Sequence, residues 1–138
     1  MVIGFKVKFY WFQVGSGSFL HSFFSTICYH LEQKKWGSKY PLLMNDLYNG
    51  CLDSGNLDDA LSELEEIITK LGEIAPSEVI WDIEDLSQKP PWGDNISQEI
   101  TNLGNYFVTS DGDDLITVLK SALQKAKELN MALTIEAL

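Results

Sequence analysis

Residues 57–71 constrain the fold more than any other stretch, because they form a helix that needs a packing partner. Apolar residues recur at helical spacing along it; they are Leu57, Leu61, Leu64, Ile68 and Leu71. The acids lie off this stripe and are Asp58, Asp59, Glu63, Glu65 and Glu66. A helix with a single apolar stripe gains most of its stability from packing that stripe against another element. The rest of the chain must therefore supply a layer for it.

Alternating and helical patterns elsewhere supply that layer. Residues 2–14 alternate like a strand, with Phe5, Val7, Phe9 and Trp11 on one face. Two shorter strands that fold back near Lys8 fit as well, although no Asn-Gly or Asp-Gly marks the turn. Helices are predicted at 18–32, after Pro41 and from 111 to about 129, the last capped by Ser110 and Asp113. Strands are predicted at 78–83, 105–110 and 131–138, with a turn-rich loop at 85–97.

These elements predict one α+β domain over residues 1–138. We expect a mixed or antiparallel sheet of about four to five strands, packed with three to four helices.

Charge restricts the partners of the chain. Its formal net charge is -10, and all ten basic residues are lysines. Residues 41–114 carry a balance of -15, while the segments before and after carry +4 and +1. Such a surface repels nucleic acid phosphates and acidic lipids, and the lack of arginine removes the usual bidentate phosphate ligand. We expect no nucleic acid or membrane partner; the acidity either attracts a basic protein or simply aids solubility.

The cysteines and the N-terminal sequence indicate a compartment. The start of the chain lacks the pattern of a signal peptide, and no apolar run approaches the roughly 20 residues of a membrane span. Cys28 and Cys51 are too few for a disulfide framework. We expect both to be reduced and partly buried, in a cytoplasmic protein.

The stretch VGSGSFLHSFF, residues 14–24, resembles a phosphate-binding loop in having two glycines between a strand and a helix. A dinucleotide-binding loop needs a third glycine where Leu20 stands, and a P-loop needs a lysine after its last glycine. The stretch therefore predicts a tight turn in which Ser16 or Ser18 caps the helix. A small hydrolase or nucleotide-binding enzyme that uses this turn is the alternative function.

Catalytic groups are the second route to an enzyme. Asp82 and Glu84 lie two apart on the predicted strand, so they share a face and could act in acid–base catalysis or bind a cation. Cys28 and His30 are two apart on a helix and point to different sides. An acidic face that meets solvent or a basic partner explains the carboxylates more simply. We therefore predict no catalytic residue, no metal site and no cofactor.

The loop KPPWGDN, residues 89–95, has the composition of a binding anchor. Two prolines stiffen it, and Trp92 lies beside the acid Asp94. Trp92 could equally pack into the core of its own chain, and Trp36 raises the same question.

Several blocks of the chain resemble one known family. They are MVIGFKV, QVGSGSFLHSFFSTI, WGSKYPLLMNDLY, VIWDIEDLSQKPPWGDNIS and NYFVTSDGDDLITVL. In this order they are similar to the bacterial polymorphic-toxin immunity protein 70 family, over almost the whole chain. The resemblance implies an α+β antidote without enzymatic activity, which binds the C-terminal toxic domain of a contact-delivered toxin. One departure is Lys8-Phe9, where the family leads us to expect a small turn.

Charge and resemblance together predict a binding face. Many delivered toxins act on nucleic acids and have basic sites, so an acidic inhibitor can stand where phosphates would bind. The predicted toxin-binding residues are Asp82, Glu84, Asp85, Trp92 and Asp94. The acidic side of the helix at 57–71, with Asp58, Asp59, Glu63 and Glu66, is the second choice. The sequence gives no oligomeric state.

Overall fold

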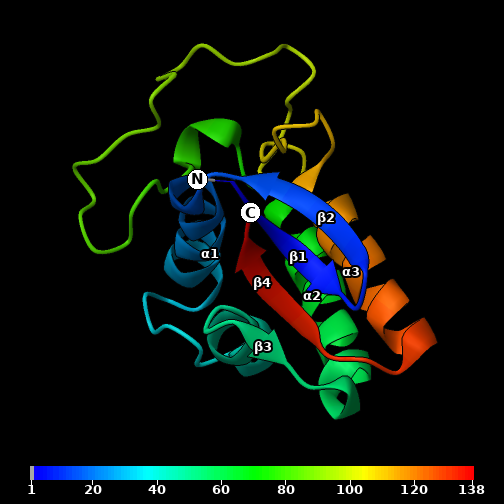
Figure 1. Ribbon diagram of the computed structural model, residues 1–138. Coiled ribbons are helices and arrows are strands. Elements are labelled where there is room, and N and C mark those ends of the chain that lie inside the picture. Colours follow the sequence, from blue (N-terminus) through cyan, green and yellow to red (C-terminus); the bar gives the residue numbers. More distant parts are fainter. Residues whose placement is uncertain (1) are drawn as a thin grey trace.

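An antiparallel sheet with strand order β2-β1-β4-β3 forms one layer of the computed structural model, which describes residues 2–138 (Figure 1). The strands are β1 (Ile3–Val7), β2 (Tyr10–Gly15), β3 (Cys51–Leu52) and β4 (Leu133–Ala137). The last strand in the sequence, β4, lies between β1 and β3 and completes the sheet. The predicted α+β class and the closing strand are confirmed. The two-residue β3 was missed, because it is too short to show a period.

The first two strands form a hairpin, which decides between the two interpretations of residues 2–14. Lys8 has a left-handed backbone with φ of 54°, and it turns the chain even though it is not glycine. Lys6 is paired with Trp11, so these two side chains share the face opposite to Phe5. The expected common face of Phe5, Val7, Phe9 and Trp11 is wrong, because the turn resets the alternation and leaves Phe9 84% exposed.

The helices cover the sheet and meet in one core. Figure 1 shows α2 (Leu57–Leu71) and α3 (Leu115–Leu129) behind the sheet and α1 (Gly17–Leu31) beside it. Shorter helical turns are η1 (Leu42–Leu47), a π-helix, and the 3-10 turns η2 (Ser54–Asn56) and η3 (Pro76–Glu78). The predicted helices at 18–32, after Pro41 and at 57–71 are confirmed. The stripe of α2 is centred on Ala60, Leu64 and Ile67, and Leu61 and Ile68 lie at its margin.

The third helix begins later than predicted. Leu115 is its first residue, and Asp114 precedes it without a side-chain capping bond. The expected cap by Ser110 and Asp113 is wrong: the backbone N–H of Asp113 donates to the hydroxyl of Thr109 instead, at 3.2 Å. This tight loop uses the residues that would otherwise form the first helical turn.

The predicted strands at 78–83 and 105–110 are absent. In the second of them Val108 forms one isolated bridge with Asp114, and Ser110 donates one backbone bond to Val14 of β2. Across the described residues, no helix has the length and apolar character required to cross a membrane.

Candidate functional site

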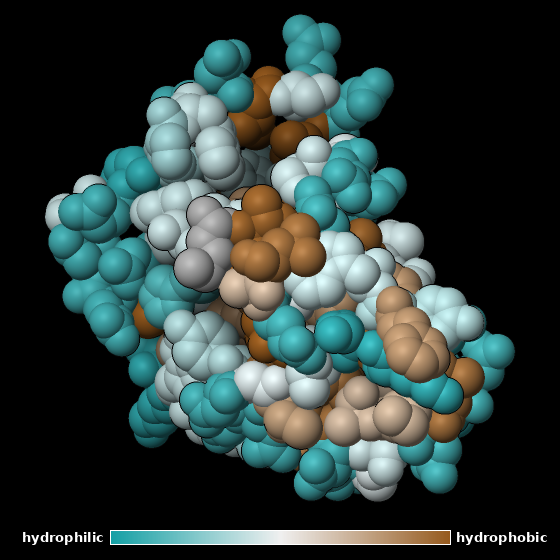
Figure 2. Space-filling model, in the orientation of Figure 1, coloured by the Kyte–Doolittle hydropathy of each residue, from teal (hydrophilic) through white to brown (hydrophobic). Residues whose placement is uncertain are grey.

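Residues 79–114, called the acidic loop below, run from η3 to α3 without a helix or strand of their own. They contain eight acids and one lysine, Lys89. In Figure 1 this loop arches over the top of the view, away from the sheet. Figure 2 shows apolar side chains exposed between hydrophilic ones in the same region. Irregular segments of this length inside a compact domain are uncommon and are usually either functional or linkers.

Helix α1 holds the start of the acidic loop through buried hydroxyl groups. Thr26 Oγ1 accepts from the N–H of Ile80 and donates to its carbonyl, and Ser22 Oγ donates to the same carbonyl at 2.8 Å. Ser25 Oγ accepts from the N–H of Ile83 at 3.1 Å. The three hydroxyl residues are fully buried. They satisfy backbone groups that a strand would have paired with another strand, which is the physical reason why 78–83 is not a strand.

Asp82 is tied to the same helix. His21 on α1 contacts Asp82 Oδ1 through Nε2 at 3.2 Å and the hydroxyl of Tyr48 through Nδ1 at 2.7 Å. The N–H of Glu84 also donates to Asp82 Oδ1, at 2.9 Å. The expectation that Asp82 and Glu84 share a strand face is therefore wrong. The carboxylate of Asp82 accepts a backbone hydrogen bond from its own loop, whereas the side chain of Glu84 is exposed.

Asp85 also organises the loop. Its carboxylate accepts bonds from the hydroxyl and the N–H of Ser87 and from the side chain of Gln88. These bonds lower the pKa of Asp85, with the Ser87 hydroxyl as the first cause. Asp85 therefore keeps its negative charge at the surface while it shapes the turn.

Trp92 lies in an aromatic cluster that joins the two halves of the acidic loop. Its indole N–H donates to the hydroxyl of Tyr106 at 2.9 Å, and its ring meets Trp81 edge to face with centroids 5.4 Å apart. Tyr106 in turn packs against Phe107 in the core. Trp92 is 39% exposed, so one side of its ring is fixed and the other faces solvent. A fixed and partly exposed aromatic ring suits a binding anchor.

Trp36 differs from Trp92. Its indole N–H donates to the carbonyl of Met44 at 2.7 Å, and its ring packs beside Phe24 and Tyr48. Trp36 therefore contributes to the packing of η1 against α1.

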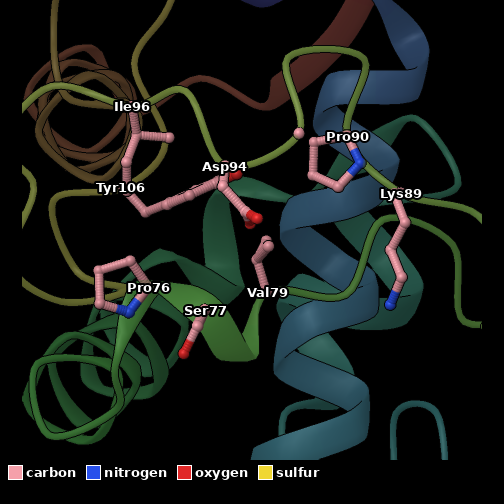
Figure 3. Close-up of a pocket in the computed structure, with 9 residues that line it drawn as sticks. Pro76, Ser77, Val79, Lys89, Pro90, Asp94, Ile96 and Tyr106 are labelled. Atoms are coloured by element: carbon pink, nitrogen blue, oxygen red, sulfur yellow. The ribbon is translucent and has the colours of Figure 1, made fainter.

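Asp94 lines a pocket of about 590 Å³ beside the aromatic cluster (Figure 3). The walls come from η3 and from the acidic loop; they are formed by Pro76, Ser77, Val79, Lys89, Pro90, Gly93, Asp94, Ile96 and Tyr106. Of the five residues of the first predicted set, Asp94 thus lines the pocket and Trp92 is joined to it through the bond to Tyr106, whereas Asp82 and Asp85 are engaged within the loop.

The second predicted set, on α2, is mostly engaged in contacts within the chain itself. Asp58 pairs with Lys127 at 2.7 Å, and Glu66 lies within 4.0 Å of both Lys39 and Lys70. Glu63 accepts the backbone N–H groups of Leu42 and Leu43 and so caps η1. Asp59 is exposed. Three of these four residues therefore hold the fold together.

The glycine turn at residues 14–24 forms the start of α1, as its sequence predicts. Ser16 caps α1 by accepting from the N–H of Phe19 at 3.1 Å, as predicted. Asp82 lines the small hollow next to Gly17 and Ser18, where its negative charge would repel a phosphate.

The two cysteines differ in exposure. Cys28 is buried, as expected, but Cys51 is exposed. Among residues 2–138, no three His, Cys, Asp or Glu side chains gather closely enough to hold a metal ion.

Sequence reasoning missed His21, Tyr48, Trp81 and Tyr106 as members of this region. A usable signal existed for the anchoring helix: Ser22, Ser25 and Thr26 form a polar stripe at helical spacing, next to the apolar residues Phe23, Phe24 and Ile27. Such a stripe must meet hydrogen-bond partners when it is buried.

An α+β domain with an acidic irregular loop, rigid at its base and aromatic at its surface, has the features of a protein-binding domain. The chain belongs to the family described as Immunity protein 70, whose sequence model matches residues 5–135. The predicted resemblance is confirmed. Membership supports an immunity role and the binding of a cognate toxin. Comparisons with curated proteins and with solved structures gave no match.

Proposed function

We propose that this protein neutralises the C-terminal domain of a contact-delivered toxin by forming a one-to-one complex through its acidic loop. The toxin domain is basic and acts on nucleic acid, and the complex covers its active site or the approach to it. The free thiols of both cysteines fit action in the cytoplasm.

One observation carries this proposal: among the described residues, lysines pair with three of the five acids of α2, Asp58, Glu65 and Glu66, but with none of the acids of the acidic loop. In the described part of the chain, every lysine–acid ion pair lies outside residues 79–114. Within the described residues, a basic side chain that does contact a loop acid is His21, whose Nε2 lies 3.2 Å from Asp82 Oδ1. The negative potential of the loop is therefore available to an external partner.

Charge and shape have separate parts in the proposed complex. Long-range attraction between the loop and a basic toxin surface speeds their encounter. Residence then depends on a few well-packed anchors, and Trp92 supplies one with little loss of entropy because Tyr106 and Trp81 already fix its ring.

Co-expression tests the proposal. The C-terminal domain of the secreted protein encoded beside this gene is produced in cells with or without the chain. We expect growth only with the chain, and copurification of the two proteins in equal amounts. Continued killing, with no complex on a sizing column, contradicts the proposal. A toxin domain from an unrelated pair is the control for specificity.

The enzyme alternative has its own test. A hydrolase or nucleotide-binding enzyme that uses the GSGS turn or the Asp82 and Glu84 carboxylates would bind ATP or Mg²⁺. Isothermal titration of the purified chain with each of them is expected to give no binding heat. Saturable heat that disappears in Asp82→Asn would favour the enzyme.

A further inference from the structure

The pocket beside Trp92 has stiff apolar walls and an acid that points inward. Pro76, Val79, Pro90 and Ile96 supply the apolar surface. Proline rings have few conformations, and Pro90 is buried, so this surface is held in place. In Figure 3 the carboxylate of Asp94 lies in the middle of the labelled side chains. A slot of this kind suits a ligand with an apolar stem and a charged end.

The charges of the pocket favour a cationic end. Lys89, the single lysine of the acidic loop, lies at the border in Figure 3 with its ammonium group directed away from Asp94. Tyr106 is only 5% exposed and already accepts the indole N–H of Trp92. Burial raises the pKa of Tyr106 and the nearby charge of Asp94 raises it further, while the bond from Trp92 opposes the rise. The Tyr106 hydroxyl therefore stays neutral, and Asp94 supplies the negative charge.

We propose that this pocket receives a lysine or arginine side chain from a loop of the toxin, whose cationic group pairs with Asp94 while its methylene stem packs on Pro76, Val79 and Ile96. The inference rests on the proposed function and gives that binding face a specific contact. Lysine and arginine bury their stems against apolar surface and keep the charged end at a polar group. The pocket is larger than one side chain, so it also has room for the backbone that carries it.

Model peptides test the chemistry of the pocket without the toxin. The chain, labelled with ¹⁵N, is titrated with acetyl-Gly-Arg-Gly-amide and with the same peptide containing citrulline, the neutral analogue of arginine. We expect the arginine peptide to shift the Trp92 indole and Gly93 amide signals with saturation, and the citrulline peptide to bind about threefold or more weakly. Equal binding of the two peptides, or shifts confined to other parts of the chain, overturns the inference.

Two variants separate Asp94 from the general charge of the loop. Asp94→Asn should reduce the affinity for the arginine peptide to that for the citrulline peptide. Glu84→Gln removes an exposed charge of the same loop and is the matched control, with little change expected. Lys89→Ala should leave binding intact or strengthen it. Binding that depends on Lys89, together with stronger shifts from inorganic phosphate than from the arginine peptide, identifies an anion site and contradicts the inference.

The same variants distinguish failure of this inference from failure of the proposed function. If the wild-type chain binds the toxin domain, Asp94→Asn should weaken that complex about tenfold or more. An unchanged complex with Asp94→Asn overturns the pocket contact and leaves the immunity role in place. Peptide binding at Asp94 without any toxin complex has the opposite meaning: the chemistry of the pocket holds and the proposed partner is wrong.

Discussion

Thr26 forms two hydrogen bonds with the backbone of Ile80, although the residues are 54 positions apart in the sequence. Its hydroxyl accepts from the N–H of Ile80 and donates to the carbonyl, both at 3.1 Å. One buried side chain thus replaces the neighbouring strand that Ile80 lacks. This arrangement fixes the base of the acidic loop to α1 and leaves the outer part of the loop exposed for contact.

Thr26→Val should destabilise the protein, because valine has the shape of threonine but leaves the Ile80 N–H without a partner. A buried donor without an acceptor costs about 1–3 kcal/mol. The Ile80 carbonyl keeps its bond from Ser22. Urea unfolding gives the free energy change, and hydrogen exchange at the Ile80 amide should become faster.

Two substitutions control this prediction. Thr26→Ser keeps the hydroxyl and should retain most of the stability. Thr69→Val removes an exposed hydroxyl that bonds within α2, and the effect should stay within about 0.5 kcal/mol. If Thr26→Val and Thr69→Val lower the free energy of unfolding equally, the hydrogen bonds to Ile80 contribute no more to stability than the exposed bond of Thr69.

Charge reversal on the acidic loop should slow binding of the toxin domain. Glu84→Lys with Asp94→Lys is expected to lower the association rate constant about tenfold or more at low salt. The difference should shrink at about 0.5 M salt, where screening shortens the range of the field. Stopped-flow fluorescence of the tryptophans can follow the association.

A second pair of reversals, Asp53→Lys with Asp59→Lys, changes the net charge of the chain by the same amount. Both residues are exposed near the start of α2. We expect a smaller effect on the association rate there, because the acidic loop is the proposed contact. A larger effect at Asp53 and Asp59 would move the binding face to α2.

Glu63 should make stability depend on pH. Burial raises its pKa above 4.5; the N–H groups of Leu43 and Leu42 oppose this rise, and the charges of Glu32 and Asp46 add to it. The native state therefore holds this proton more tightly than the unfolded chain does. Glu63 therefore adds to the free energy of unfolding at pH values below the pKa that it has in the unfolded chain. This contribution is lost as the pH rises through the raised pKa of Glu63 in the native state.

The comparison with Glu63→Gln isolates this contribution. The unfolding free energy of the wild type minus that of Glu63→Gln should decrease between about pH 4 and about pH 7. Urea unfolding at both pH values measures it, and Glu73→Gln, at an exposed position, corrects for loss of a carboxyl group. If this difference grows with pH, the hydrogen bonds from the N–H groups of Leu42 and Leu43 lower the pKa of Glu63 more than burial raises it.

The two cysteines should react at very different rates. Cys51 is exposed, whereas Cys28 is buried and its pKa is raised, first by burial and then by the charge of Glu32. Since the thiolate is the reactive form, a thiol reagent such as DTNB should label one cysteine per native chain and the second only after unfolding. Cys51→Ser should abolish the fast reaction; fast labelling that remains would place Cys28 at the surface.

The local pattern of the sequence determined the helices at α1 and α2, the serine cap of α1 and the closing strand β4. In each case the signal lies within about four residues, as periodicity or as a capping side chain. The turn at Lys8 remained open, because a residue other than glycine adopts a left-handed backbone only when its surroundings compensate the strain.

Residues 85–97 were predicted as a turn-rich loop, which is confirmed, but tertiary structure alone decided that the segments on both sides, 79–83 and 105–110, belong to the same irregular stretch. Residues 78–83 have the composition of a strand, but they lie against the hydroxyl groups of Ser22, Ser25 and Thr26 rather than beside another strand. Tertiary contacts also decided which carboxylates have partners. Glu63 and Asp58 bind groups that are distant in the sequence. Within residues 2–138, the acids of the acidic loop form no ion pair with a lysine. The sequence fixes how many charges the chain has, but the field at the surface depends on which of them the folded chain brings together.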